Sequence, residues 1–166
     1  MDSKEKVKQQ QSRILESLMG WEQVVGALYA RYAEMFPGVT EFWLRLAREE
    51  EGHAKQLGSL RILLREGHVF WNIGRFREEA IQDEVDVVKK ALDGTEAGRQ
   101  LALAEALETA GQIEDSILEA GFYDTVESEV PEFAKVARTL ADATRQHAER
   151  ISALLNDARG ADRPNA

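Results

Sequence analysis

The feature that most constrains this chain is a heptad seam between residues 43 and 64 that one carboxylate and one imidazole interrupt. Alternating steps of three and four residues along this seam give Trp43, Leu46, Glu50, His53, Leu57, Leu60 and Leu64. Such a stripe is the face that a helix turns toward its partners. Glu50 and His53 stand one helical turn apart, so both side chains can reach one metal ion. Burying a bare carboxylate costs several kcal/mol against a total stability of roughly 5–15 kcal/mol. The carboxylate must therefore be paired, protonated or bound to a metal.

The composition predicts an all-α protein without strands. Ala, Leu, Glu, Arg and Gln dominate the 166 residues, there are only three prolines, and no window alternates in the period-two manner of a strand. At this length we expect a single domain over residues 1–166, with a helical bundle at about 5–158 and a frayed tail at 159–166.

Charge and cysteine content restrict the function classes. The chain has no cysteine, which excludes disulfides and zinc ribbons and fits a reducing, cytoplasmic compartment. Its start is charged and leads into no apolar segment, so no signal peptide is expected, and no run is long enough to span a bilayer. A net charge of −9 argues against a nucleic-acid partner. The expected partners are metal ions and a second copy of the chain in a homodimer.

Five helices are predicted, at about residues 5–36, 40–66, 75–92, 95–128 and from Pro131 to about 158, with Thr40 as an N-cap. Polar residues also interrupt the apolar seams of the other three long helices. They are Glu22 in the first helix, Glu114 in the fourth, and Thr144 with His147 in the last. The aromatic-rich segment 68–74 is predicted to be a loop that covers one end of the bundle, with a dimer contact as the alternative.

These interruptions lie at matching heights. The first two predicted helices are joined by a turn at Pro37-Gly38. Glu22 lies about 15 residues before this turn and Glu50 about 12 residues after it, so both lie roughly 20 Å from the end of the bundle where the turn is. Glu114 and position 144 are placed similarly about the turn near Val130. The pattern predicts two antiparallel hairpins, joined by the 75–92 helix, that form a four-helix bundle with one long helical crossover between its second and third helices.

One Glu from each of two helices and a Glu-x-x-His from each of the other two form the ligand set of ferritin-like di-iron carboxylate proteins. The chain resembles that superfamily over about residues 10–155 and is most similar to rubrerythrin-type domains. The resemblance is carried by Glu22 with Tyr29, by Phe42-Trp43 with Glu50-Glu51-Gly52-His53-Ala54, by Ile113-Glu114-Asp115-Ser116, and by Ala141 with Gln146-His147-Ala148. It implies that Glu22 is a terminal ligand, that Glu50 bridges, and that His53 binds the same iron as Glu22. Glu114 and His147 would hold a second iron.

The second Glu-x-x-His motif is incomplete, because Thr144 stands where its carboxylate is expected and Asp142 points to another face. Three inward carboxylates nearly balance one divalent ion, whereas two ions would need an added anion. A single ion at Glu22, Glu50 and His53 is therefore the favoured occupied state, with a weak or empty second site.

Other departures from the family restrict the function further. No Cys-x-x-Cys pair is present, and Ile117 replaces an additional carboxylate of rubrerythrins, which weakens a peroxidase assignment. Glu51 stands where bacterioferritins have a haem ligand, so we expect no haem.

Two functional hypotheses follow. The first is an iron-binding protein (Fe2+/Fe3+, with manganese and zinc open as alternatives) that acts as an iron oxidase or reduces dioxygen or peroxide. The second is a non-catalytic helical interaction module in which the glutamates and histidines form a metal-free polar network. Tyr29 is a candidate hydrogen-bond partner of this network, and Glu49 and Glu51 are assigned to a solvated face.

Overall fold

The computed structural model describes residues 3–68, 70–71, 78–121, 123, 127–128 and 130–161. Five α-helices make up nearly all of this part of the chain, which confirms the all-α prediction: α1 (Ser3–Met35), α2 (Thr40–Arg65), α3 (Glu78–Glu96), α4 (Leu103–Glu119) and α5 (Pro131–Ala161). A short 3-10 turn, η1 (Pro37–Val39), joins α1 to α2. Helix α5 extends three residues into the segment predicted to be frayed, and residues 162–166 lie outside the described part.

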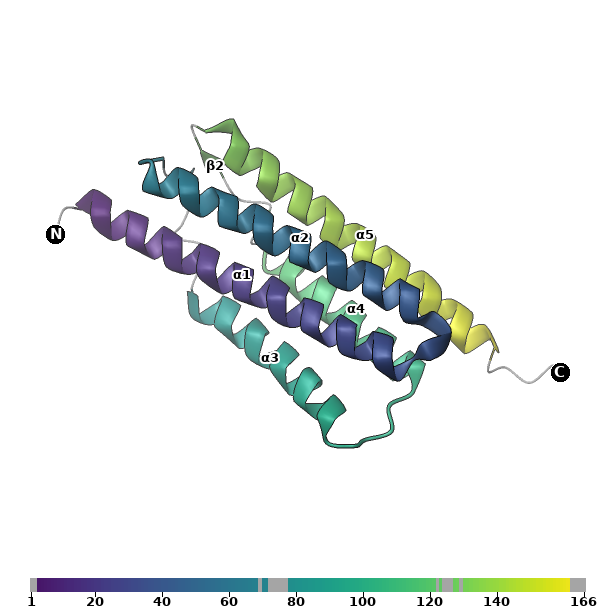
Figure 1. Cartoon of the computed structure of the whole chain (residues 1–166). Coiled ribbons are helices and arrows are strands. Elements are labelled where there is room, and N and C mark those ends of the chain that lie inside the picture. Colours follow the sequence, from purple (N-terminus) through teal and green to yellow (C-terminus); the bar gives the residue numbers. More distant parts are fainter. Residues whose placement is uncertain are drawn as a thin grey trace.

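The helices pack side by side as a bundle. Helix α1 packs along α2, and α4 packs along α5. Helix α3 lies along the outside of α1 and contacts α4 only weakly. Figure 1 shows α2 and α4 running in one direction while α1, α3 and α5 run in the other. The chain therefore returns along the bundle through α3 before α4 begins.

The turn between α1 and α2 follows from Pro37, which cannot continue α1. Thr40 is the first residue of α2 rather than its N-cap, which is Val39, so that detail of the prediction was wrong. The Thr40 hydroxyl instead donates a hydrogen bond of 3.0 Å to the carbonyl oxygen of Ala33. This bond ties the start of α2 to the last turn of α1.

Helix α4 is much shorter than the predicted 95–128 helix. Thr95 is not its first residue but belongs to α3, where its hydroxyl donates to the carbonyl of Leu92. Gly98 and Gly121 adopt positive φ angles of 72° and 66°, a conformation that interrupts a right-handed helix. The Glu105 carboxylate accepts a hydrogen bond of 2.9 Å from the backbone N–H of Ala102 and so caps the helix start. The glycines were visible in the sequence, but their role as stops was not recognised.

The prediction of no strands was also wrong, by a small margin. Strand β1 (Phe70–Trp71) pairs antiparallel with β2 (Glu127–Ser128), with Phe70 opposite Ser128. The pair links the α2–α3 connection to the α4–α5 connection. Two residues are too few to show a period-two pattern. The covering role predicted for 68–74 falls mostly on residues outside the described part.

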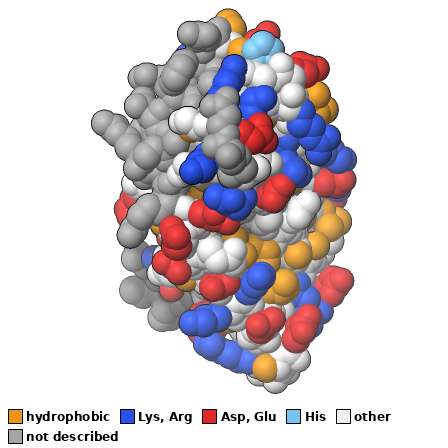
Figure 2. Space-filling model, turned by 90° about the vertical axis from the view of Figure 1, so that its left-hand side faces the viewer, with side chains coloured by type: hydrophobic (Ala, Val, Ile, Leu, Met, Phe, Trp, Pro, Cys, Tyr) orange, Lys and Arg blue, Asp and Glu red, His pale blue; other side chains and the backbone are white. Residues whose placement is uncertain are grey.

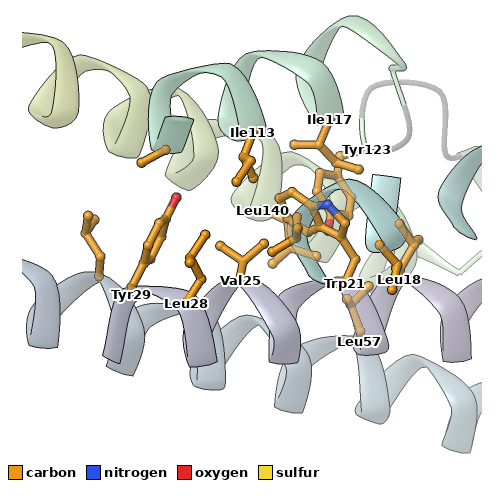
Figure 3. Close-up of a cluster of buried hydrophobic side chains, with 14 of the residues drawn as sticks. Leu18, Trp21, Val25, Leu28, Tyr29, Leu57, Ile113, Ile117, Tyr123 and Leu140 are labelled. Atoms are coloured by element: carbon orange, nitrogen blue, oxygen red, sulfur yellow. The ribbon is translucent and has the colours of Figure 1, made fainter. Parts of the chain in front are cut away.

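The predicted seams form the core. All seven seam residues of α2 are buried. In Figure 3, Trp21 and Val25 rise from α1 toward Ile113 and Ile117 of α4. On the face in Figure 2, acidic and basic side chains are interspersed over the part of the surface that is described. Among the described residues, no helix is both long enough and apolar enough to cross a membrane.

Candidate metal centre

The structure brings all five residues singled out from the sequence into one buried centre. Glu22 comes from α1, Glu50 and His53 from α2, Glu114 from α4 and His147 from α5, and none is more than 6% exposed. They form two groups of three residues, and in each group one ligand atom from every residue lies within 4.8 Å of the other two. One group is Glu22, Glu50 and His53, and the other is Glu50, Glu114 and His147. Glu50 belongs to both.

The two groups have nearly the same geometry. His53 Nδ1 lies 2.8 Å from Glu50 Oε2 and 3.5 Å from Glu22 Oε2. His147 Nδ1 lies 2.8 Å from Glu50 Oε1 and 3.5 Å from Glu114 Oε1. The two imidazole rings stack with centroids 5.3 Å apart and planes inclined by 23°. Each oxygen of Glu50 therefore faces a different histidine, as a bridging carboxylate requires.

Four polar atoms of this centre are buried without a hydrogen-bond partner: Glu22 Oε2, Glu50 Oε1, Glu114 Oε2 and His147 Nδ1. The Glu50 Oε1 and His147 Nδ1 atoms are close enough for a hydrogen bond but are not aligned for one. An unpartnered buried polar atom costs about 1–3 kcal/mol. Oxygen and imidazole nitrogen atoms that face one another in this way are suitable ligands for a divalent transition metal, so the donor set fits a cation.

Two tyrosines hold the outer carboxylates. The Tyr29 hydroxyl donates a hydrogen bond of 2.5 Å to Glu114 Oε1, which answers the question that the sequence left open for Tyr29. The Tyr123 hydroxyl donates to Glu22 Oε1. Burial, strengthened by the facing carboxylates, raises the pKa of both tyrosines well above the usual value, so both remain donors. Sequence reasoning missed Tyr123, because it follows the end of α4 and belongs to no helical seam.

Glu49 was assigned to a solvated face, and that assignment was wrong. Its side chain is only 31% exposed, and its Oε2 lies 2.9 Å from Nε2 of His147. Arg150 and Arg45 also donate to this carboxylate and, against the effect of burial, lower the pKa of Glu49 to about 2. An ionised carboxylate at Nε2 keeps the proton there and leaves the Nδ1 lone pair of a neutral His147 directed at the centre.

Position 144, where the second Glu-x-x-His motif would have its carboxylate, supplies no carboxylate to the centre. Thr144 is buried, but its hydroxyl donates to the carbonyl of Leu140 at 2.9 Å and is turned back onto its own helix. Asp142 is exposed, in agreement with the prediction that it points to another face, and it forms an ion pair with Arg145. The described centre therefore offers three carboxylates and two imidazoles.

Without a metal ion, the centre holds protons. Burial and the nearby Glu50 raise the pKa of Glu22 to about 8. Burial alone would lower the pKa of both histidines. However, the facing carboxylates of Glu22 and Glu50 raise the pKa of His53 to about 9, and those of Glu114 and Glu50 raise the pKa of His147 to about 10. A divalent ion that binds here must displace these protons.

No family model matches the chain, and neither the curated proteins nor the solved structures contain a match.

Proposed function

We propose that this chain is a ferritin-like metal-binding protein whose centre binds divalent iron and supports its oxidation by dioxygen or peroxide. The observation that carries the proposal is the pair of three-residue groups that share Glu50 in a fully buried position. The path of the chain supports the ferritin-like topology, because α3 returns along α1 and lets α2 and α4 run in the same direction. A homodimeric assembly is also part of the proposal.

Charge balance sets the expected stoichiometry. Three carboxylates with neutral imidazoles carry a negative charge that nearly balances one divalent ion. Two divalent ions would need an additional anion. Glu22, Glu50 and His53 would hold the first ion. In the second group, Glu49 already orients the histidine. The missing carboxylate at Thr144 is therefore the main reason to expect a lower metal affinity there.

The residues around the centre have separable tasks in this proposal. Glu22, Glu50 and Glu114 supply negative charge, and the two histidines supply neutral nitrogen ligands. Tyr29 and Tyr123 each hold one carboxylate oxygen and leave the other free for the metal. The apolar seams exclude water, which strengthens the electrostatic binding of a cation. Bound ferrous iron would supply the electrons that reduce dioxygen or peroxide.

One observation favours the second hypothesis, a metal-free interaction module. His53 Nδ1 lies at hydrogen-bond distance from Glu50 Oε2, so a protonated His53 can neutralise part of the centre. Such a network would satisfy several groups without a metal. Protons and a metal ion therefore compete for the same ligand atoms, and we prefer metal binding because two groups of three possible ligands share Glu50.

A metal titration separates the two functions. Ferrous iron is added anaerobically to the purified, chelator-treated chain, bound iron is measured by mass spectrometry, and the near-ultraviolet absorption is followed after exposure to air. We expect one or two ions per chain and a new oxo-iron absorption. Glu51→Gln is the matched control, because Glu51 neighbours Glu50 but is exposed and paired with Lys55. Absence of both bound iron and absorption in the wild type would leave only the interaction module.

A further inference from the structure

A pocket of about 300 Å³ opens between α1 and α2 directly beside the metal centre. Its walls are the small or apolar residues Gly26, Ala30, Leu44 and Ala47. Glu22 also lines it, although this side chain is fully buried. The pocket therefore ends against a residue of the centre without exposing it.

The wall between this pocket and Glu50 is thin because residue 26 has no side chain. A Cβ atom added at Gly26 would lie 3.4 Å from Glu50 Cβ and 3.5 Å from the carbonyl oxygen of Ala47. Glycine within a helix costs about 1 kcal/mol relative to alanine. Gly26 thus lets α1 pack against α2 beside the shared ligand, with no side chain of its own between the pocket and Glu50.

The charges at the rim of the pocket are compensated. Arg48 forms an ion pair of 2.6 Å with Glu41, and Glu51 forms one of 2.7 Å with Lys55. The walls are mainly alkyl groups. Gln23 also lines the pocket, but Glu22 is buried in the centre and Glu51 is paired, so a hydrated cation would lose water there for little gain. A small uncharged molecule loses little and is the occupant that this lining suits.

We propose that this pocket is the entry site through which dioxygen reaches the centre from the side of Glu22 and Glu50. This inference rests on the proposed function, since it concerns the oxidant of that same centre. Dioxygen occupies the pocket as an intact molecule and passes the thin wall at Gly26 when the helices fluctuate.

The chain contains a natural comparison. A second pocket, of about 220 Å³, lies between α4 and α5 and is lined by Gly111, Ala148 and Ile151 among others. None of the five centre residues lines it. A Cβ atom added at Gly111 would meet only Ile151, at 3.8 Å. A filling substitution here changes a helix interface in the same way but leaves the approach to the centre unchanged.

The test fills each pocket in turn. Ala30→Leu and, as a second variant, Leu44→Trp fill the proposed entry site, and Ala148→Leu is the control. The first measurement uses crystals of the metal-free protein under xenon pressure, because xenon binds apolar cavities. In the pocket between α1 and α2, we expect xenon in the wild type and in Ala148→Leu. We expect no xenon in that pocket in the two filling variants.

The second measurement is the rate at which the ferrous-loaded protein reacts with dissolved dioxygen. The two filling variants should react about tenfold more slowly than the wild type, with unchanged iron stoichiometry, and Ala148→Leu should react at the wild-type rate. Wild-type rates in both filling variants, or no xenon in the wild-type pocket, would overturn the entry site alone. A wild type that binds no iron would overturn the proposed function, and the entry site with it.

Discussion

Oε1 of Glu50 and Nδ1 of His147 lie 2.8 Å apart with no hydrogen bond between them. On the opposite side of the same carboxylate, Oε2 lies 2.8 Å from Nδ1 of His53 in a geometry that does allow a hydrogen bond. The other ring nitrogen of His147, Nε2, lies 2.9 Å from Glu49 Oε2. On the side of the centre where Thr144 replaces a carboxylate, Glu49 therefore contacts the ring nitrogen of His147 that faces away from Glu50.

Glu50 should be indispensable for both metal positions. Glu50→Gln removes the shared negative charge and should lower cobalt affinity at both positions by about 100-fold or more. Glu22→Gln should weaken only one position, because Glu22 belongs to one group. Calorimetric titration with Co2+ measures both. Unchanged binding by Glu50→Gln would show that the two groups do not hold metal.

Glu49 should act through His147 rather than as a ligand. Glu49→Gln loses the charge that keeps the proton on Nε2, and should weaken the Glu114–His147 position by about 10–100-fold while leaving the other unchanged. Cobalt spectroscopy would separate the two positions, with Glu51→Gln as the neighbouring control. Equal loss in both variants would mean a non-specific charge effect.

Thr144→Glu should raise iron stoichiometry toward two ions per chain. Thr144 is buried on the seam of α5 one turn before His147, so a carboxylate there supplies the charge that a second ion needs. Bound iron is measured after anaerobic loading. Asp142→Asn is the control, because its exposed carboxylate faces away from the centre and should not affect the count.

Replacing Glu50 and His53 together by leucine should have opposite effects with and without metal. In chelator, the variant should be more stable to urea by about 1 kcal/mol or more, because apolar packing often exceeds a buried ion pair in stability. With metal at 100 times its dissociation constant, the wild type alone should gain about 2.7 kcal/mol. Identical unfolding midpoints of the wild type with and without metal would contradict this.

The metal-free protein should lose stability as pH rises from about 4.5 to about 10. The pKa of Glu22 rises on folding from 4.5 to about 8, and those of His53 and His147 rise from 6.5 to about 9 and about 10. In this range the folded state binds more protons than the unfolded state, so each unit of pH weakens it. The lowered pKa of Glu49 acts in the opposite direction only below pH 4.5.

Urea midpoints followed by circular dichroism in chelator at pH 5, 7 and 9 would measure this loss. Metal affinity should change in the opposite direction over the same range, because binding requires the deprotonated ligands. A midpoint that stays constant or rises with pH would contradict the protonated centre.

The periodicity of the sequence was enough to predict five helices and their buried faces, but not where α4 begins and ends. In an α-helix every third or fourth residue points the same way, so Glu22 and Glu50 had to share a face with their apolar neighbours. The matching distances from the first turn also placed these two carboxylates at one height. That the residues bind a metal stays a prediction. The incomplete motif at Thr144 was visible for the same reason.

The tertiary structure decided what depends on the register between distant segments. Glu49 and His147 are separated by 98 residues and come from neighbouring helices, so no spacing along one helix reveals their contact. Tyr123 lies beyond the end of α4 and just after Gly121 with its positive φ, and from there its hydroxyl donates to Glu22, 101 residues earlier in the chain. Helical periodicity is local and can be read from a chain, whereas the choice of partner across a bundle is made only when the helices pack.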